Sequence, residues 1–252
     1  MNKYVENLNR IEFIITYACT GRCKHCSEGE HRSSGRHIDA DVAARVVRDA
    51  AGKYDITSVM TFGGEPLLYP ETVYAVHAAA MEMNIPKRQL ITNGFFSKSS
   101  TKIQTVVEKL VQCGVNDILL SVDAFHQETI PLEQVRQFAA EVSKSGINLR
   151  INPAWLVSKK HDNPYNCRTH EIVVEFESMG ILQSSGNVII PSGNALKYLS
   201  DYYDMSKEYI SPYEEDPQDI RSISVAPDGD VLGENIYKTG ILEILDKYVP
   251  CV

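Results

Sequence analysis

The chain has 252 residues, of which 43% are hydrophobic and 23% are charged, as is usual for a soluble globular protein. Its formal charge of −8 argues against a nucleic-acid partner and against an anionic membrane surface. The first residues lack the apolar core of a signal peptide, and no apolar stretch approaches membrane-spanning length, so we expect a cytoplasmic protein.

Apolar runs and helical patterns alternate along most of the chain. Strands are expected over residues 10–16, 56–62, 88–92, 117–122, 147–152 and 186–190. Helices are expected after Asp39, from Pro70 to 83, over 103–111, over 132–142 before Gly146, and over 170–179. This order predicts parallel strands with crossover helices, and therefore an α/β fold that forms a partial (β/α)6 barrel of the TIM type.

The last quarter of the chain has a different pattern. Residues 198–219 are rich in Tyr, Asp, Glu, Ser and Pro and predict a surface connection. Residues 221–232 predict a hairpin that turns at Asp228 and Gly229, and residues 241–248 predict a terminal helix. We therefore expect a barrel of residues 1–197 followed by a short hairpin-helix extension, residues 198–252.

Three cysteines, Cys19, Cys23 and Cys26, lie in a CxxxCxxC spacing directly after the first predicted strand. Thiolates are soft ligands, and three at this spacing suit an iron–sulfur cluster that keeps one iron open for another ligand. The remaining cysteines are scattered, so a second cluster is not expected; they are Cys113, Cys167 and Cys251.

Polar or glycine-rich segments follow several of the predicted strands. They include Gly63–Pro66, Asn93-Gly94 and Ser121–Asp123. Because the carboxyl ends of parallel strands meet at one rim of a barrel, we expect these segments beside the cysteine loop. Glycines at 63 and 64 would let a ligand approach the backbone closely.

The cysteine motif and the Gly63-Gly-Glu-Pro66 segment together resemble those of the radical S-adenosylmethionine (SAM) enzymes, over about residues 10–195. The resemblance implies a [4Fe–4S] cluster on Cys19, Cys23 and Cys26, with SAM bound to the fourth iron. It also implies reductive cleavage of SAM to a 5′-deoxyadenosyl radical, which abstracts a hydrogen atom from the substrate. An electron donor such as flavodoxin or ferredoxin would then be a partner.

The same resemblance suggests residues that contact SAM. His25 occupies the place of an aromatic residue near adenine, although a solvated loop histidine is the alternative. Gly63, Gly64 and Glu65 would meet the amino group of SAM, largely through backbone oxygens, and Pro66 would fix the turn.

Other positions that match the pattern of this family each have two interpretations. Ser121 and Asp123 match a Ser-x-Asp pattern that meets the ribose or the carboxylate of SAM, or they cap the next helix. Asn93 matches a third-strand motif, although Asn-Gly is also a common turn.

The partner of the SAM carboxylate is not decided by the sequence. Arg136 and Arg150 are candidates for it, or they are surface charges. Asn194 lies where the pattern often has arginine, near the segment that approaches adenine, so its role stays open.

Residues 222–245 resemble a SPASM or twitch extension that lacks the cysteines for auxiliary clusters. This tail favours a peptide substrate, as in the modification of ribosomally made peptides, over a small metabolite. Since the chain begins almost at its first predicted strand, we expect a peptide to need a separate recognition partner.

Two alternatives to this function remain. The first is an activase that installs a glycyl radical on a partner enzyme. The second is a non-enzymatic iron–sulfur or zinc protein, in which His25 or His31 supplies the fourth zinc ligand.

Overall fold

The computed structural model describes residues 2–30 and 35–250, so His31 and Cys251 lie outside it. Its centre is a seven-stranded sheet with the order β7-β5-β4-β3-β2-β1-β9, in which all neighbours are parallel. These strands are β1 (Arg10–Ile14), β2 (Ser58–Phe62), β3 (Lys87–Thr92), β4 (Asp117–Leu120), β5 (Asn148–Ile151), β7 (Leu182–Gln183) and β9 (Ser222–Val225).

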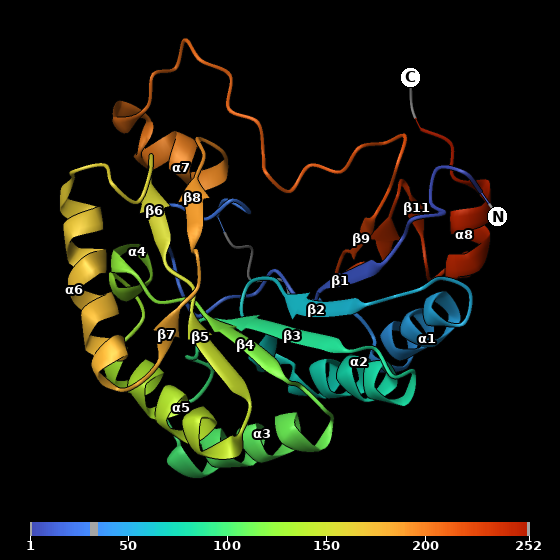
Figure 1. The fold of residues 1–252 in the computed structure, drawn as a ribbon, viewed down its shortest axis with the longest axis horizontal. Helices are drawn as coiled ribbons and strands as arrows, with labels where there is room; N and C mark the ends of the chain where they lie inside the picture. Colours follow the sequence, from blue (N-terminus) through green and yellow to red (C-terminus); the bar gives the residue numbers. More distant parts are fainter. Residues whose placement is uncertain (1, 31–34, 251–252) are drawn as a thin grey trace.

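Long helices cover the outer face of this curved sheet (Figure 1). They are α1 (Ala40–Ala51), α2 (Pro70–Glu82), α3 (Ser100–Gln112), α5 (Leu132–Ser145) and α6 (Pro164–Ser178). Asp39 caps α1 by accepting hydrogen bonds from two backbone N–H groups, and Gly146 ends α5 with a φ of 81°. The predicted α/β partial barrel is therefore confirmed. Within the described residues, no helix is long and apolar enough to cross a membrane.

The barrel bends at Pro153, beyond the end of β5. The chain continues as β6 (Ala154–Leu156), and β7 likewise continues as β8 (Asn187–Ile189). β6 and β8 pair with each other in a separate two-stranded parallel sheet. Proline cannot donate to a ladder, so a break here is expected. The predicted sixth strand is thus β8, whereas β6 and β7 were not predicted.

Several short elements and one helix start also differ from the sequence pattern. α6 begins at Pro164, earlier than residue 170, because Asn163 caps it and proline suits the first helical position. Short elements follow four strands or helices: η1 (Pro66–Leu68), α4 (Ala124–Gln127), α7 (Gly193–Tyr198) and η2 (Ser200–Tyr202).

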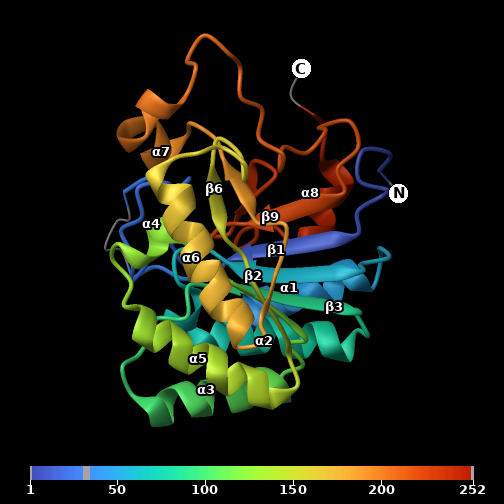
Figure 2. The ribbon, with the colours of Figure 1, turned by 60° about the vertical axis from the view of Figure 1, so that its left-hand side comes forward.

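The C-terminal segment packs against the barrel. After a long connection that arches over one end of the molecule (Figure 2), β9 pairs in parallel with β1. The predicted turn forms at Asp228 and Gly229, and the Ala226 N–H donates to the Asp230 carbonyl across it at 2.9 Å, but the two arms do not extend into a β ladder. β10 (Asp230–Val231) pairs instead with β11 (Glu234–Asn235), and α8 (Ile241–Lys247) follows.

Candidate active site

The three cysteines of the predicted cluster motif lie together in the loop that follows β1. Cys23 is buried, Cys19 and Cys26 are half-buried, and their thiols influence one another electrostatically. Burial raises the pKa of Cys19 to about 11, and it also raises the pKa values of Cys23 and Cys26. The thiols therefore stay protonated at neutral pH unless a cation stabilises the thiolates.

The turn after β2 is joined to the start of this loop. The backbone N–H of Gly64 donates to the Thr16 carbonyl at 2.7 Å, and that of Glu65 donates to Ala18 at 2.8 Å. A Cβ atom at position 64 would lie 2.2 Å from the Ala18 oxygen, and one at Gly63 would lie 2.6 Å from the Thr16 oxygen. Only glycine permits this approach, which brings two strand ends into contact.

The side chain of Glu65 is buried and points to the end of β3. Its carboxylate accepts hydrogen bonds from the backbone N–H groups of Leu67 and Asn93 and from the Thr92 hydroxyl, at 2.7–2.9 Å. Burial raises the pKa of Glu65 to about 7, although these hydrogen bonds act in the opposite direction. Its side chain therefore ties the ends of β2 and β3 together.

Asn93 extends from the end of β3 to the cysteine loop. Its side-chain Nδ2 lies 3.6 Å from the Cys19 sulfur and 3.2 Å from the Thr20 hydroxyl. Its Oδ1 accepts a hydrogen bond from the backbone N–H of Phe95, which forms the turn expected of Asn-Gly. The residue therefore combines a turn with a contact to the Cys19 thiol.

Asp123 caps α4 and holds His126. Its carboxylate accepts hydrogen bonds from the backbone N–H groups of Phe125 and His126, from Ala154, and from His126 Nδ1 at 2.7 Å. Burial alone would raise the pKa of Asp123, but His126 lowers it to about 2. The helix-cap geometry is the one observed, while Ser121 is half-buried at the same rim.

The two histidines of the site lie against Cys23. Ligating atoms of Cys23, His25 and His126 all lie within 4.8 Å of one another. Burial and the charge of His126 lower the pKa of His25 to about 4, so its imidazole is neutral at pH 7. No cofactor contact was predicted for His126 from the sequence. Its position three residues after Asp123 nevertheless indicates an ion pair between these two side chains.

Asn194 meets the cysteine loop from the far end of the barrel. Its Nδ2 donates to the Cys23 carbonyl at 3.1 Å, and its backbone N–H donates to the Cys26 carbonyl at 2.9 Å. The segments named by the sequence motifs are therefore gathered at the carboxyl ends of the strands.

Comparison with known proteins agrees with this arrangement. The family described as the radical SAM superfamily matches residues 13–150, which is more than half of the chain. The chain belongs to the radical SAM superfamily. It is accordingly an enzyme, and its family uses a [4Fe–4S] cluster and SAM.

Curated relatives match only part of their own length. The chain is 26% identical over 132 residues to GTP 3′,8-cyclase of Desulforamulus reducens and 27% identical over 131 residues to that of Syntrophomonas wolfei subsp. wolfei. Each match covers 51% of this chain and 38% of the relative, so the chain spans well under half the length of these proteins.

Solved structures with the same fold cover nearly the whole chain. Streptococcus suis SuiB bound to precursor peptide SuiA has a TM-score of 0.60 at 13% identity, over 96% of this chain and 65% of that one. SuiB bound to SAM has a TM-score of 0.59 at 15% identity, over 96% and 66%. anSMEcpe with bound AdoMet and Cp18Cys peptide has a TM-score of 0.58 at 14% identity, over 95% and 80%.

The residues of this radical SAM enzyme fit an iron–sulfur cluster. Three thiols lie in one short loop beside the buried carboxylates of Glu65 and Asp123, whose charges raise the pKa values of Cys19 and Cys23 further. Such a set of donors favours a soft, multiply charged cation.

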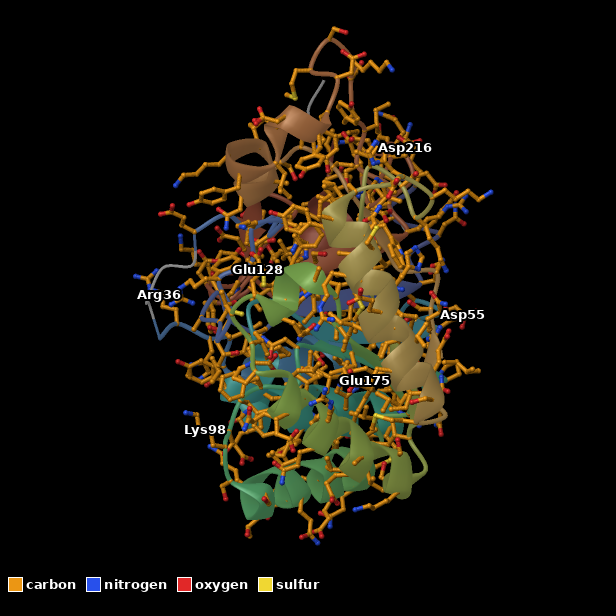
Figure 3. All side chains as sticks on the ribbon, turned by 90° about the vertical axis from the view of Figure 1, so that its left-hand side faces the viewer. Arg36, Asp55, Lys98, Glu128, Glu175 and Asp216 are labelled. Carbon is orange, nitrogen blue, oxygen red and sulfur yellow. The ribbon has the colours of Figure 1, made fainter. Side chains whose placement is uncertain are left out.

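The two arginine candidates have carboxylate partners within the chain. Arg136 pairs with Glu175, which Figure 3 shows on the outer helix α6, and with Glu133 at 3.3 Å. Arg150 donates to both oxygens of Asp117, at 2.9 and 2.7 Å. Both guanidinium groups are therefore paired with carboxylates of the chain itself, and Asp117 was not anticipated as a partner.

A polar row crosses the inner face of this enzyme's sheet. Cross-strand register aligns Glu12, Met60, Gln89, Asp117 and Asn148 on neighbouring strands. Gln89 and Asn148 donate to Asp117, while Ser224 of β9 donates to Glu12 at 3.0 Å. Because Ile11 and Phe13 of β1 join the core under the helices, this row faces the interior of the partial barrel.

Proposed function

We propose that this radical SAM enzyme holds its [4Fe–4S] cluster on Cys19, Cys23 and Cys26 and acts on a peptide. When bound, the cluster and SAM supply an electron and a 5′-deoxyadenosyl radical, which takes a hydrogen atom from the substrate. The observation that carries this proposal is the gathering of the three thiols in one shielded loop, beside the glycine turn after β2.

The glycine turn and the rim would bind SAM. The N–H groups of Gly64 and Glu65 are used by the cysteine loop. Within the described part of the chain, the carbonyl oxygens of Gly63 and Gly64 accept no hydrogen bond, so they are free to receive an amino group. His25, tilted against Phe125 at 5.0 Å between ring centroids, would lie near adenine, with Pro66 fixing the turn.

Polar side chains at the rim would complete the cofactor contacts. Ser121 is half-buried, and its hydroxyl would meet the ribose. Asp123 would act by holding His126, because four hydrogen bonds already occupy its carboxylate. Asn93 would donate to the Cys19 thiolate, a contact that tunes the potential of iron–sulfur clusters.

A peptide suits the open side of the partial barrel. The end strands β7 and β9 of the large sheet do not pair with each other, so the described barrel is not closed by hydrogen bonds. An extended chain could therefore reach the inner face at the two ends of the polar row, where Asn148 is exposed and Glu12 is half-buried. Peptide complexes of SuiB and anSMEcpe, which share the fold, support this choice.

Single substitutions of the three cysteines test the assignment. In Cys19→Ala, Cys23→Ala or Cys26→Ala, a cluster lacks one ligand, so we expect 5′-deoxyadenosine formation to fall below detection. Iron content and nucleoside release would be measured on anaerobically reconstituted, reduced protein.

The exposed Cys167 provides a matched control, since Cys167→Ala should keep wild-type iron and turnover. Wild-type 5′-deoxyadenosine release by any of the three motif variants would contradict the cluster assignment. Stoichiometric zinc in place of iron, without nucleoside release, would favour the non-enzymatic alternative and the Cys23, His25 and His126 site.

A further inference from the structure

The first turn of α7 contacts the cysteine loop through the side chain and the backbone N–H of one residue, Asn194. Asn194 is 7% exposed, and its Nδ2 donates to the carbonyl of Cys23 at 3.1 Å. Its own N–H donates to the carbonyl of Cys26 at 2.9 Å. Two of the three proposed cluster ligands are therefore held by one residue from the distant end of the barrel.

Gly193 allows this contact because it carries no side chain. Its φ is +51°, and an added Cβ would lie 2.3 Å from the Ser27 oxygen and 2.5 Å from the Cys26 oxygen. Further along α7, Lys197 forms an ion pair with Glu30, and the Tyr198 hydroxyl lies 3.4 Å from the same carboxylate. The helix thus meets both the ligand positions and the following part of the loop.

In the second half of the loop, from Cys23 to Gly29, the backbone–backbone hydrogen bonds within the segment are long. The N–H of Cys26 donates to the Cys23 carbonyl at 3.3 Å, and that of Gly29 donates to the Cys26 carbonyl at 3.2 Å. The bonds from Asn194 to the same two carbonyls, at 3.1 and 2.9 Å, are shorter and therefore contribute to the order of this segment. The carbonyl orientation at a residue sets its peptide planes, and through them the direction of its Cα–Cβ bond.

We propose that Asn194 is a positioning residue for the cluster: together with Gly193 it fixes the backbone of Cys23 and Cys26 so that their thiolates converge. The proposal rests on the cluster assignment above and adds a role that the SAM-contact pattern does not include. Metal ligands lose affinity when the groups that orient them are removed. Asn194 therefore influences retention and symmetry of the cluster through hydrogen bonds to carbonyls, rather than by touching it.

The test uses Asn194→Asp, Asn194→Ala and Gly193→Ala in the anaerobically loaded enzyme. Aspartate keeps the shape of asparagine but cannot donate when ionised, so it isolates the hydrogen bond. We expect iron release to a chelator to accelerate about fivefold to tenfold in the two Asn194 variants, as for the loss of one buried hydrogen bond. Gly193→Ala should accelerate release at least as much.

Two further readouts separate positioning from general stability. The reduced-cluster electron paramagnetic resonance spectrum should change its g values in Asn194→Asp, because the ligand geometry changes. The affinity of the loaded fraction for SAM should stay as in wild type. Leu196→Ala is the matched control, since Leu196 lies on the same helix and is 48% exposed; its release rate and spectrum should match wild type.

Wild-type release rates and spectra in Asn194→Asp and Gly193→Ala would overturn the proposal. Reduced SAM affinity with unchanged iron release would also overturn it and assign Asn194 to the cofactor. Equal acceleration in Leu196→Ala would show general destabilisation instead. These outcomes differ from failure of the proposed function, in which the wild-type protein itself would retain no cluster or release no 5′-deoxyadenosine.

Discussion

Arg150 and Arg136 illustrate how the surroundings of a charge decide its role. Arg150 meets Asp117, whose side chain is only 9% exposed and also accepts hydrogen bonds from Gln89 and Asn148. Burial alone would raise the pKa of Asp117, but Arg150 and these amides lower it overall. The pair of Arg136 with Glu175 is 37% exposed on both sides, so water competes with it.

We expect Arg150→Met to reduce the free energy of unfolding by about 3 kcal/mol, because it leaves a nearly buried carboxylate without its cation. Arg136→Met should cost less than about 1 kcal/mol, as is usual for an exposed pair. Urea unfolding of the two variants measures both values. SAM affinity should be unchanged in each, and a tenfold loss in either variant would instead assign that arginine to the SAM carboxylate.

His77 is a buried histidine away from the site. It is 0% exposed on α2, its Nε2 lies 2.9 Å from the Thr61 hydroxyl, and its Nδ1 has no partner among the described residues. Burial, together with the charge of Arg88, lowers the pKa of His77 to about 3. The imidazole is therefore neutral in the folded protein at every pH where the protein is expected to work.

This histidine should make stability depend on pH. Between its ordinary pKa near 6.5 and its folded pKa of about 3, the unfolded chain binds a proton that the folded chain does not. The free energy of unfolding therefore loses nothing to His77 above its ordinary pKa, and it falls progressively as the pH drops from about 6.5 to about 3. His77→Leu should reduce the slope between pH 6 and 4 by up to about 1.4 kcal/mol per unit. His170→Gln, at an exposed position of α6, is the control, and an unchanged slope in His77→Leu would contradict the assignment.

At the scale of elements, the sequence predicted most helices and central strands because caps and apolar spacing coincide with them. The start of α6 was missed because its core-facing positions are polar. Asn166 and Thr169 are buried there, and they bond to backbone groups of Leu156 and Ala124. A search for apolar periodicity cannot detect a helix that buries satisfied polar groups.

The site likewise contains features that the sequence predicted and contacts that it did not. Motif spacing and strand-end placement predicted the cysteine loop and the glycine turn, because both depend on local chemistry. The contacts of Asn194 to Cys23 and of Arg150 to Asp117 depend on how distant segments meet. Short strands such as β7 carry too little pattern to be identified at all.

The β6–β8 pair depends on a close approach at Gly186. Its φ is +71°, and an added Cβ would lie 2.4 Å from the Pro153 oxygen and 2.7 Å from Trp155 Nε1. Gly180 has a similar φ of +80°, with nothing within 4 Å of the added atom. Gly180→Ala should therefore lower the free energy of unfolding by about 1 kcal/mol, through backbone strain alone.

We expect Gly186→Ala to lower the free energy of unfolding by at least about 2 kcal/mol more than Gly180→Ala, because the bend at Pro153 must open. Urea unfolding measures the difference, and hydrogen exchange of β6 and β8 locates it. Equal losses in the two variants would show that the close contact is not needed for this part of the barrel.

At the scale of the molecule, the tail contributes to the same core as the barrel. β9 covers the edge of β1, and α8 lies near α1 at that side (Figure 1). The described tail also supplies buried side chains to the main hydrophobic cluster, namely Ile220, Ile223, Val225, Val231, Ile236, Ile241, Ile244 and Leu245. If the chain divides into a barrel of residues 1–197 and an extension, the barrel should fold without the tail. Removing the tail tests this.

A chain that ends at residue 219 would test this division. It loses β9, so the edge of β1 has unpaired backbone groups, and the apolar surface beneath the tail is exposed to water. We expect this variant to aggregate or to lack a cooperative unfolding transition, whereas a chain that ends at residue 250 should behave as wild type. A soluble, cooperative 1–219 protein that still binds iron would show that residues 1–197 form a domain by themselves, with the tail as an accessory to it.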